Sequence, residues 1–239
     1  MTGTLINVAS VIILSVLGTL IGDRLPDRFR QTVMAGLGLV TMLIGVQMAL
    51  KTQHLLIVLG SVVIGGIIGE ALNIDLGLER LGRWLEARVA RFGVPASDPA
   101  ATTGPSFTRG FVTASLLFCV GPMAIIGSFQ DGLTGDYQTL AVKSMLDGFA
   151  SIAFASSLGI GVAFSALSVF FYQGALTLGA GWVKGLLTDP MITEMTATGG
   201  LLVVGIALGL LNLKSMRVAN LLPSIFLAPV AVAFLGAWL

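Results

Sequence analysis

The chain has little charge and few residues that could hold a metal. Charged residues make up 10% of its 239 residues, whereas they make up about 25% of a typical soluble domain. A chain so poor in charge has no large soluble domain, and its net charge of +1 gives no sign of a nucleic-acid partner. One histidine and one cysteine cannot form a His/Cys metal cluster. We therefore expect neither a metal site of that kind nor a nucleic-acid partner.

Enzyme motifs are also missing. The sequence has no zinc-binding pattern, no P-loop and no G-x-G-x-x-G motif. No H-E-x-x-H motif or paired-acid protease signature can be placed on it. The single cysteine, Cys119, cannot form an internal disulfide, and it lies in an apolar run where we expect a buried, inert thiol. These absences predict a protein that is not an enzyme and uses no cofactor.

The start of the chain lacks the features of a secretory signal. Met1-Thr2-Gly3 leads directly into apolar sequence, without a basic stretch before it. No small-residue cleavage site follows the apolar segment. We expect this segment to be a first spanning helix.

Apolar sequence is what the chain has in abundance. Hydrophobic residues make up 55% of it, and the mean hydropathy is +0.96. A spanning helix needs about 20 mostly apolar residues. The uncharged run 148–183 would form a helix of about 54 Å, too long for a bilayer core of roughly 30 Å, so it must fold back near Gly159.

We predict an all-α transmembrane bundle of about eight spans, forming one integral membrane domain over 1–239. The predicted spans are 3–22, 31–50, 55–69, 107–121, 137–157, 165–184, 195–213 and 218–239, with Pro223 and Pro229 kinking the last.

One segment has a different pattern. Between 75 and 92, apolar side chains recur at helical spacing, and Trp84 and four arginines accompany them. This pattern predicts an amphipathic helix that either lies on the membrane surface or packs on the protein's own cytosolic face. The segment 93–106 contains three prolines and is predicted to be a flexible linker. The apolar face of the helix carries Leu78, Leu81, Leu85, Val89 and Phe92.

Basic residues gather on one side of the predicted bundle. Ten of the thirteen Lys and Arg residues fall in alternate connections, while the opposite connections hold only Lys51 and Lys184. By the positive-inside rule the basic connections are cytosolic, so both termini are predicted to face out. Lys143 is the remaining basic residue and lies inside a predicted span.

A short sequence pattern occurs twice. The stretches 16–23 and 63–70 both end a span with glycines four residues apart followed by an acid, at Gly18 and Gly22 and again at Gly65 and Gly69. Small residues at this spacing let helices approach closely. The repeat indicates either a shared packing signal or an internal duplication.

The stretch 119–151 combines acids, a lysine and several glycines among apolar segments. Counted back from the turn near Gly159, Lys143 and Asp147 lie inside the fifth span. Their i, i+4 spacing allows them to pair on one helix face, with Ser144 beside them. Ionisable residues within a membrane are rare and usually functional. The pair is either a structural link between helices or a site that opens when a solute or proton competes for Asp147.

Two further features flank this pair. Gly121-Pro122 interrupts helical hydrogen bonding and either kinks the fourth span or starts a half-helix whose free N–H groups lie inside the protein. Gln130, Asp131 and Asp136 are expected in a Gly-rich turn at the outer mouth. The two acids there could attract a cation or belong to an ordinary solvated loop.

Several motifs together resemble a known family. They are Phe118-Cys119, Gly135-Asp136, Lys143-Ser144-x-Leu146-Asp147, Ser157-Leu158-Gly159-Ile160, Gly199-Gly200-Leu201-Leu202 and Asn220-x-Leu222-Pro223. In this order over essentially the whole chain, they resemble the bacterial YdfK/YqgA inner-membrane family, whose domain has no known function. The resemblance implies a multi-pass protein of the bacterial inner membrane and implies no reaction.

Together these features predict a secondary transporter or permease for a small solute or ion. Its site is expected between spans four and five, with Asp147 as the ligand-contacting acid, Lys143 as its switchable partner, and Asp136 and Asp131 at the entrance. The alternative is a membrane scaffold or assembly partner in which the pair is purely structural. The expected partners are the lipid bilayer and the unidentified solute, and homo-oligomerisation stays open.

Overall fold

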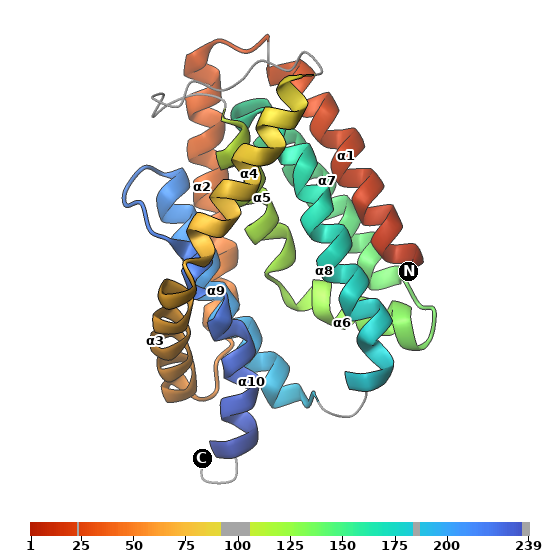
Figure 1. Cartoon of the computed structure of the whole chain (residues 1–239), viewed down its shortest axis with the longest axis vertical. Helices are drawn as coiled ribbons and strands as arrows, with labels where there is room; N and C mark the ends of the chain where they lie inside the picture. Colours follow the sequence, from red (N-terminus) through yellow and green to blue (C-terminus); the bar gives the residue numbers. More distant parts are fainter. Residues whose placement is uncertain (23, 92–105, 184–186, 236–239) are drawn as a thin grey trace. The chain divides into compact units, whose positions relative to one another are not determined.

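The computed structural model describes the chain except for residues 23, 92–105, 184–186 and 236–239, and the described part contains helices and no strands (Figure 1). The predicted linker 93–106 therefore lies almost wholly outside the described residues. The helices are α1 (Thr2–Gly22), α2 (Asp27–Ala49), α3 (Leu55–Leu72), α4 (Ile74–Ala90), α5 (Phe107–Cys119), α6 (Pro122–Leu133), α7 (Gln138–Leu158), α8 (Gly161–Val183), α9 (Asp189–Leu210), the 3-10 turn η1 (Val218–Leu221) and α10 (Pro223–Leu235).

Proline and glycine set several of the helix boundaries. Pro122 begins α6 and Pro223 begins α10, positions where a missing backbone N–H costs nothing. Gly159 ends α7 with φ 87°, which favours glycine, and α8 starts two residues later. The run 148–183 folds back there, as its length requires. Pro223 was expected to kink the last span, but it starts a helix after η1; Pro229 lies inside α10.

The described residues separate into two compact units. Unit 1 contains residues 1–37, 78–119 and 123–181, and unit 2 contains residues 38–77, 120–122 and 182–239. Each unit is assembled from segments that are distant in the sequence. The prediction of a single membrane domain is not tested by this division.

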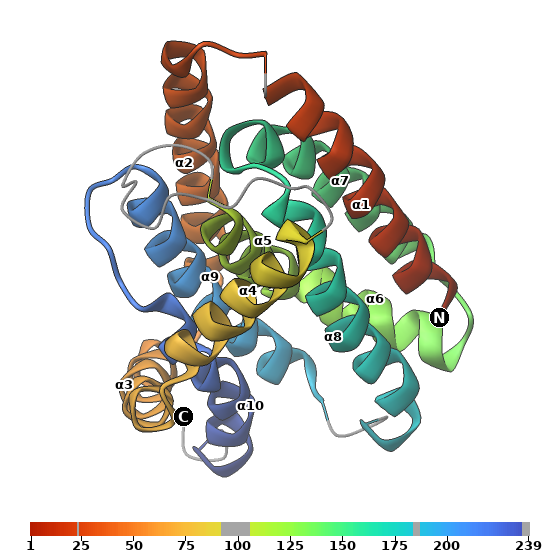
Figure 2. The ribbon, with the colours of Figure 1, turned by 45° about the horizontal axis from the view of Figure 1, so that its top comes forward.

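In unit 1, α1 and α7 run side by side in the same direction (Figures 1 and 2). Gly18 faces the backbone of Ile152, and Gly22, one turn later, faces Ser156. A Cβ at either glycine would lie under 3.0 Å from those backbone atoms, so only glycine permits this approach.

The segment predicted to be amphipathic forms α4, whose residues from Leu78 onward belong to unit 1. Gly82 is buried against Thr108 and Phe111 of α5, and the Thr108 hydroxyl donates to Glu86 at 3.2 Å. α4 thus packs on the protein itself, while Leu81 and Trp84 on its other flank are exposed. Whether that flank touches a membrane stays a prediction.

In unit 2, the second glycine pattern also makes a close helix contact, but with a different geometry. Gly65 faces Ser224 of α10, and Gly69 faces Asn220 of η1. α3 therefore runs antiparallel to η1 and α10, whereas α1 and α7 run parallel. The opposite directions favour a shared packing signal over a duplication.

Five described helices are long and apolar enough to cross a membrane: α1, α2, α3, α8 and α9. The number becomes six if α5 and α6, which meet at an angle of 64°, count as one span. α7 is 21 residues long, but its polar residues keep it outside this set. An all-helical architecture with five or six candidate spans is thus confirmed for the described residues, and the count of eight spans stays a prediction.

Candidate functional site

The predicted Lys143–Asp147 pair forms in the structure. Both residues lie on the buried face of α7 in unit 1, with 6% and 9% of their surfaces exposed. The Lys143 ammonium donates to Asp147 Oδ2 across one helical turn. Two opposite charges this deeply buried stabilise each other, because either one alone would be costly in an apolar interior.

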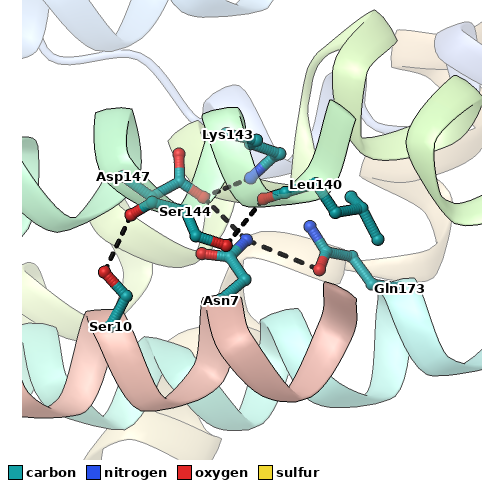
Figure 3. Close-up of polar contacts among 7 residues, drawn as sticks. All are labelled: Asn7, Ser10, Leu140, Lys143, Ser144, Asp147 and Gln173. Atoms are coloured by element: carbon teal, nitrogen blue, oxygen red, sulfur yellow. Dashed lines mark hydrogen bonds and ion pairs between the residues drawn. The ribbon is translucent and has the colours of Figure 1, made fainter. Parts of the chain in front are cut away.

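The partners of the pair come from α1 and α8 (Figure 3). Asn7 of α1, which is fully buried, donates from Nδ2 to Asp147 Oδ2 at 3.0 Å and to Gln173 Oε1 at 3.4 Å. Gln173 of α8 is also fully buried. The site was expected between the fourth and fifth spans, but Asp147 of α7 contacts Asn7 of α1, and Asn7 in turn contacts Gln173 of α8.

Ser144 lies beside the pair, but its hydroxyl is already used. It donates to the Leu140 carbonyl of its own helix at 2.6 Å, while Ser10 of α1 donates to the Ser144 carbonyl at 2.8 Å (Figure 3). The Ser10 bond connects α1 to α7, at a point on α1 that precedes Gly18 and Gly22 in the sequence. Ser144 therefore holds helices together in this structure, and its role as a ligand is still a prediction.

Some buried polar atoms around the pair have no partner. Among the described residues, Asn7 Oδ1, Gln173 Nε2 and Ser151 Oγ make no hydrogen bond, although all three side chains are fully buried. Ser151 lies one turn after Asp147 on the same face of α7. Buried polar atoms in native proteins nearly always have a partner, so these three atoms are candidates for contact with a ligand.

Of the three residues expected at the outer mouth, Gln130 and Asp131 lie in a helix and Asp136 lies in the turn that follows it. Gln130 and Asp131 lie in the last turn of α6, not in a loop, and Asp131 is 5% exposed. Asp131 Oδ2 accepts from the backbone N–H of Gly3 and pairs with the Met1 ammonium, both at 3.0 Å. Gln130 accepts from the Thr139 hydroxyl at 2.6 Å. The expectation of a turn at 130–131 was wrong.

Asp136 is the exposed member of that set. It lies between α6 and α7, and its carboxylate accepts from the N–H of Gln138 at the start of α7 at 3.0 Å. This contact spans two residues and is of the Asx-turn type, which shapes the turn that leads into α7. Its predicted part in an entrance is untested.

Gly121 and Pro122 separate α5 from α6. The 64° bend between these helices is a true break, and α6 begins at Pro122 as the half-helix interpretation requires. A Cβ at Gly121 would meet nothing within 4 Å, so close packing does not explain this glycine. The glycine is explained instead by its position directly before the proline at the bend.

The site predicted from the sequence included neither Asn7 nor Gln173. The sequence shows that each is an amide in an otherwise uncharged span. It does not show that Asn7 contacts both Asp147 and Gln173. The predicted site also omitted Glu194, which is 1% exposed in unit 2. Glu194 accepts from the Thr52 hydroxyl at 2.7 Å and from the backbone N–H groups of Gln53 and His54, at 2.8 and 3.1 Å. It thereby fixes the turn before α3.

No group of three or more His, Cys, Asp or Glu side chains that could hold a metal occurs among the described residues. The cluster around the pair thus consists of one carboxylate, one ammonium and two amides.

Comparison with known proteins finds one matching family model and two full-length relatives. A family model described as "Protein of unknown function (DUF554)" matches residues 2–233. The "Uncharacterized membrane protein YdfK" of Bacillus subtilis (strain 168) is 31% identical over 244 residues, covering 100% of this chain and 98% of the relative. The "Uncharacterized protein YqgA" of Escherichia coli (strain K12) is 32% identical over 240 residues, covering 99% and 98%. No solved structure matches. These matches confirm the resemblance that the sequence motifs indicated.

Proposed function

The chain belongs to the DUF554 family of proteins of unknown function, and we propose that it is a secondary transporter or permease for a small solute or ion. Its site is the buried cluster of Asn7, Lys143, Asp147 and Gln173. Asp147 contacts the ligand, and Lys143 is the partner that the ligand displaces.

One observation carries this proposal. A buried ion pair lies next to amide atoms that have no partner, Asn7 Oδ1 and Gln173 Nε2. A purely structural pair would be expected to have all neighbouring polar atoms satisfied, because each orphan costs about 1–3 kcal/mol. A transport site must leave some groups free, since they have to bind a ligand and release it.

The proposed arrangement has eight spans: α1, α2, α3, the bent α5–α6 pair, α7, α8, α9 and α10. An even number puts both termini on the same side, and the basic connections put that side outside the bacterial inner membrane. The parallel directions of α1 and α7 agree with this count, because both are odd-numbered spans.

The orientation predicts where introduced cysteines react. In a Cys119→Ala background, Lys51→Cys should react with a membrane-impermeant maleimide on intact cells. Arg91→Cys should react only in inside-out vesicles. Both positions are exposed in the structure, so access depends on the side and not on burial. Labelling of both from the same side would contradict the proposed topology.

The transport proposal is tested with purified protein in liposomes. Uptake is measured for a panel of radiolabelled amino acids, carboxylates and sugars, and an internal pH-sensitive dye reports ion movement. Parent liposomes should show uptake above empty ones for at least one compound or ion, and Asp147→Asn should lower it at least about tenfold, which corresponds to about 1.4 kcal/mol. The matched control is Asp189→Asn, an exposed acid at the start of α9. Equal loss in both variants, or no loss in Asp147→Asn, would refute the assigned site.

A scaffold is the alternative function. The observation in its favour is that Asn7, Lys143 and Asp147 already connect α1, α7 and α8 by direct bonds. Under this alternative, a well-folded protein would move no solute, and replacing Asp147 would affect folding alone.

A further inference from the structure

We propose that the buried cluster of unit 1 binds a small monovalent cation of the sodium class, with Asp147, Asn7 Oδ1 and Ser151 Oγ as its oxygen ligands. This inference rests on the proposed transport function and names the ion that the site would take. In the resting state described by the structure, the Lys143 ammonium lies on the carboxylate that the cation would use.

The orientation of Asn7 supplies the first argument. Its Nδ2 donates to Asp147 Oδ2 at 3.0 Å, and a carboxylate oxygen can only accept, so the amide cannot be turned round. Gln173 Oε1 also accepts from the same Nδ2. The carbonyl oxygen Oδ1 is therefore held in a fully buried position, next to the carboxylate, without a donor. An acceptor fixed in this way suits a cation.

Ser151 supplies the second argument. It lies one turn after Asp147 on the same buried face of α7, and its hydroxyl has no partner. Ser144, one turn before Asp147 on the other side, bonds to its own helix instead. Hard cations prefer carboxylate, carbonyl and hydroxyl oxygens, and Asp147, Asn7 and Ser151 supply one of each.

Charge balance selects a monovalent ion. The cluster contains one carboxylate and one ammonium and is neutral as it stands. A monovalent cation on Asp147 neutralises the carboxylate and leaves one positive charge, on Lys143, to be moved away. A divalent ion would leave two positive charges in a buried apolar setting, which is far more costly.

Competition with Lys143 makes the site a switch. The cation and the ammonium carry like charges and would both lie against the Asp147 carboxylate, so binding of the ion favours release of the Lys143 side chain. The apparent affinity for the ion is then reduced by the fraction of molecules in which Lys143 has left Asp147. Removing Lys143 should remove this competition.

Binding is tested by thermal stability of the purified full-length protein in detergent, without any transport measurement. A ligand that binds the folded state raises the melting temperature in a concentration-dependent way. NaCl is compared with choline chloride at equal ionic strength, so that general salt effects cancel. The parent should melt at a higher temperature in NaCl, and Ser151→Ala should lose most of this difference. Ser157→Ala should keep it, because Ser157 is also a buried, unpartnered serine of α7 but lies outside the cluster.

Lys143→Met provides the sharper test. Without the competing ammonium, the sodium concentration that gives half of the melting shift should fall about tenfold if the displaced state has a population of about 10% in the parent. Equal melting temperatures in NaCl and choline chloride for both the parent and Lys143→Met would overturn the cation site. That result would leave the transport proposal standing, since solute uptake and its loss in Asp147→Asn are measured separately. Should Lys143→Met fail to fold, the comparison of Ser151→Ala with Ser157→Ala decides alone.

Discussion

Leucine in place of Gly22 or Gly69 should destabilise the protein by about 3 kcal/mol or more, at the upper end of what overpacking usually costs. Even a Cβ at either position would lie under 3.0 Å from backbone atoms, of Ser156 for Gly22 and of Asn220 for Gly69. A flexible side chain could turn aside, but a helix backbone can only shift as a whole. The contacts across the whole helix pair would then be lost together.

The consequences of the two changes differ between the units. In unit 1, separation of α1 from α7 would weaken the Asn7 contact with Asp147, since these residues come from the same two helices. In unit 2, displacement of η1 would disturb Asn220, which donates to Glu70 at 2.6 Å and accepts from the backbone N–H of Asp75 at 2.7 Å. Gly69→Leu should therefore also loosen the turn between α3 and α4.

Thermal melting in detergent measures these effects, and the chain offers matched controls. A Cβ at Gly60 of α3 or Gly179 of α8 would meet nothing within 4 Å. Gly60→Leu and Gly179→Leu make the same chemical change in helices of the two units without the overlap. They should melt close to the parent. Parental melting of Gly22→Leu and Gly69→Leu would show that these helix contacts do not exist as described.

The sequence was sufficient for features that depend on local spacing. Lys143 and Asp147 were expected to pair because four residues bring side chains to the same helix face. The return of the chain near Gly159 followed from the length of an uncharged run compared with the thickness of a bilayer. The close contacts at Gly18 and Gly65 were foreseen in kind, but their partners were not, because those partners lie well over a hundred residues away in the sequence.

Glycine shows why other predictions failed. Gly127 and Gly132 suggested a turn around Gln130 and Asp131, yet α6 continues through both glycines to Leu133. Gly132 instead faces the backbone of Thr177 in α8, and Gly127 faces Leu140 in α7. The turn comes later, at Gly135 with φ 73°. A glycine used for close approach and one used for a turn look the same in a sequence, since the difference depends on a neighbour from another segment.

The candidate cluster was predictable only in part for a related reason. Asn7 and Gln173 are 166 residues apart, and each by itself is typical of a residue that links helices. Their joint importance follows from the fold, which brings Asn7 to the carboxylate of Asp147 and Gln173 to the amide of Asn7. No local pattern encodes that meeting.

Loss of one member of the buried pair should be far more damaging than loss of both. Asp147→Asn leaves the Lys143 ammonium buried without a counter-charge, and a broken buried pair typically costs about 3–5 kcal/mol. The same holds for Lys143→Met, which leaves the carboxylate. In contrast, Lys143→Met combined with Asp147→Leu removes both charges, and apolar replacement of a buried pair is often neutral. The double variant should therefore melt within a few degrees of the parent, well above either single variant.

If the parent carries flux, flux measured on that double variant separates a pair that belongs to the transport site from a pair that is only structural, because folding is no longer in question. If Asp147 contacts the transported solute or ion, a double variant that folds normally should carry no flux in liposomes, whatever its stability. If the pair only links α7 to its neighbours, parental flux should return together with parental stability. Until a substrate is found, proton or cation leak through liposomes serves as the measured flux. A stable double variant with parental flux would remove Asp147 and Lys143 from the transport site, since no route through that carboxylate can operate once a leucine has replaced it.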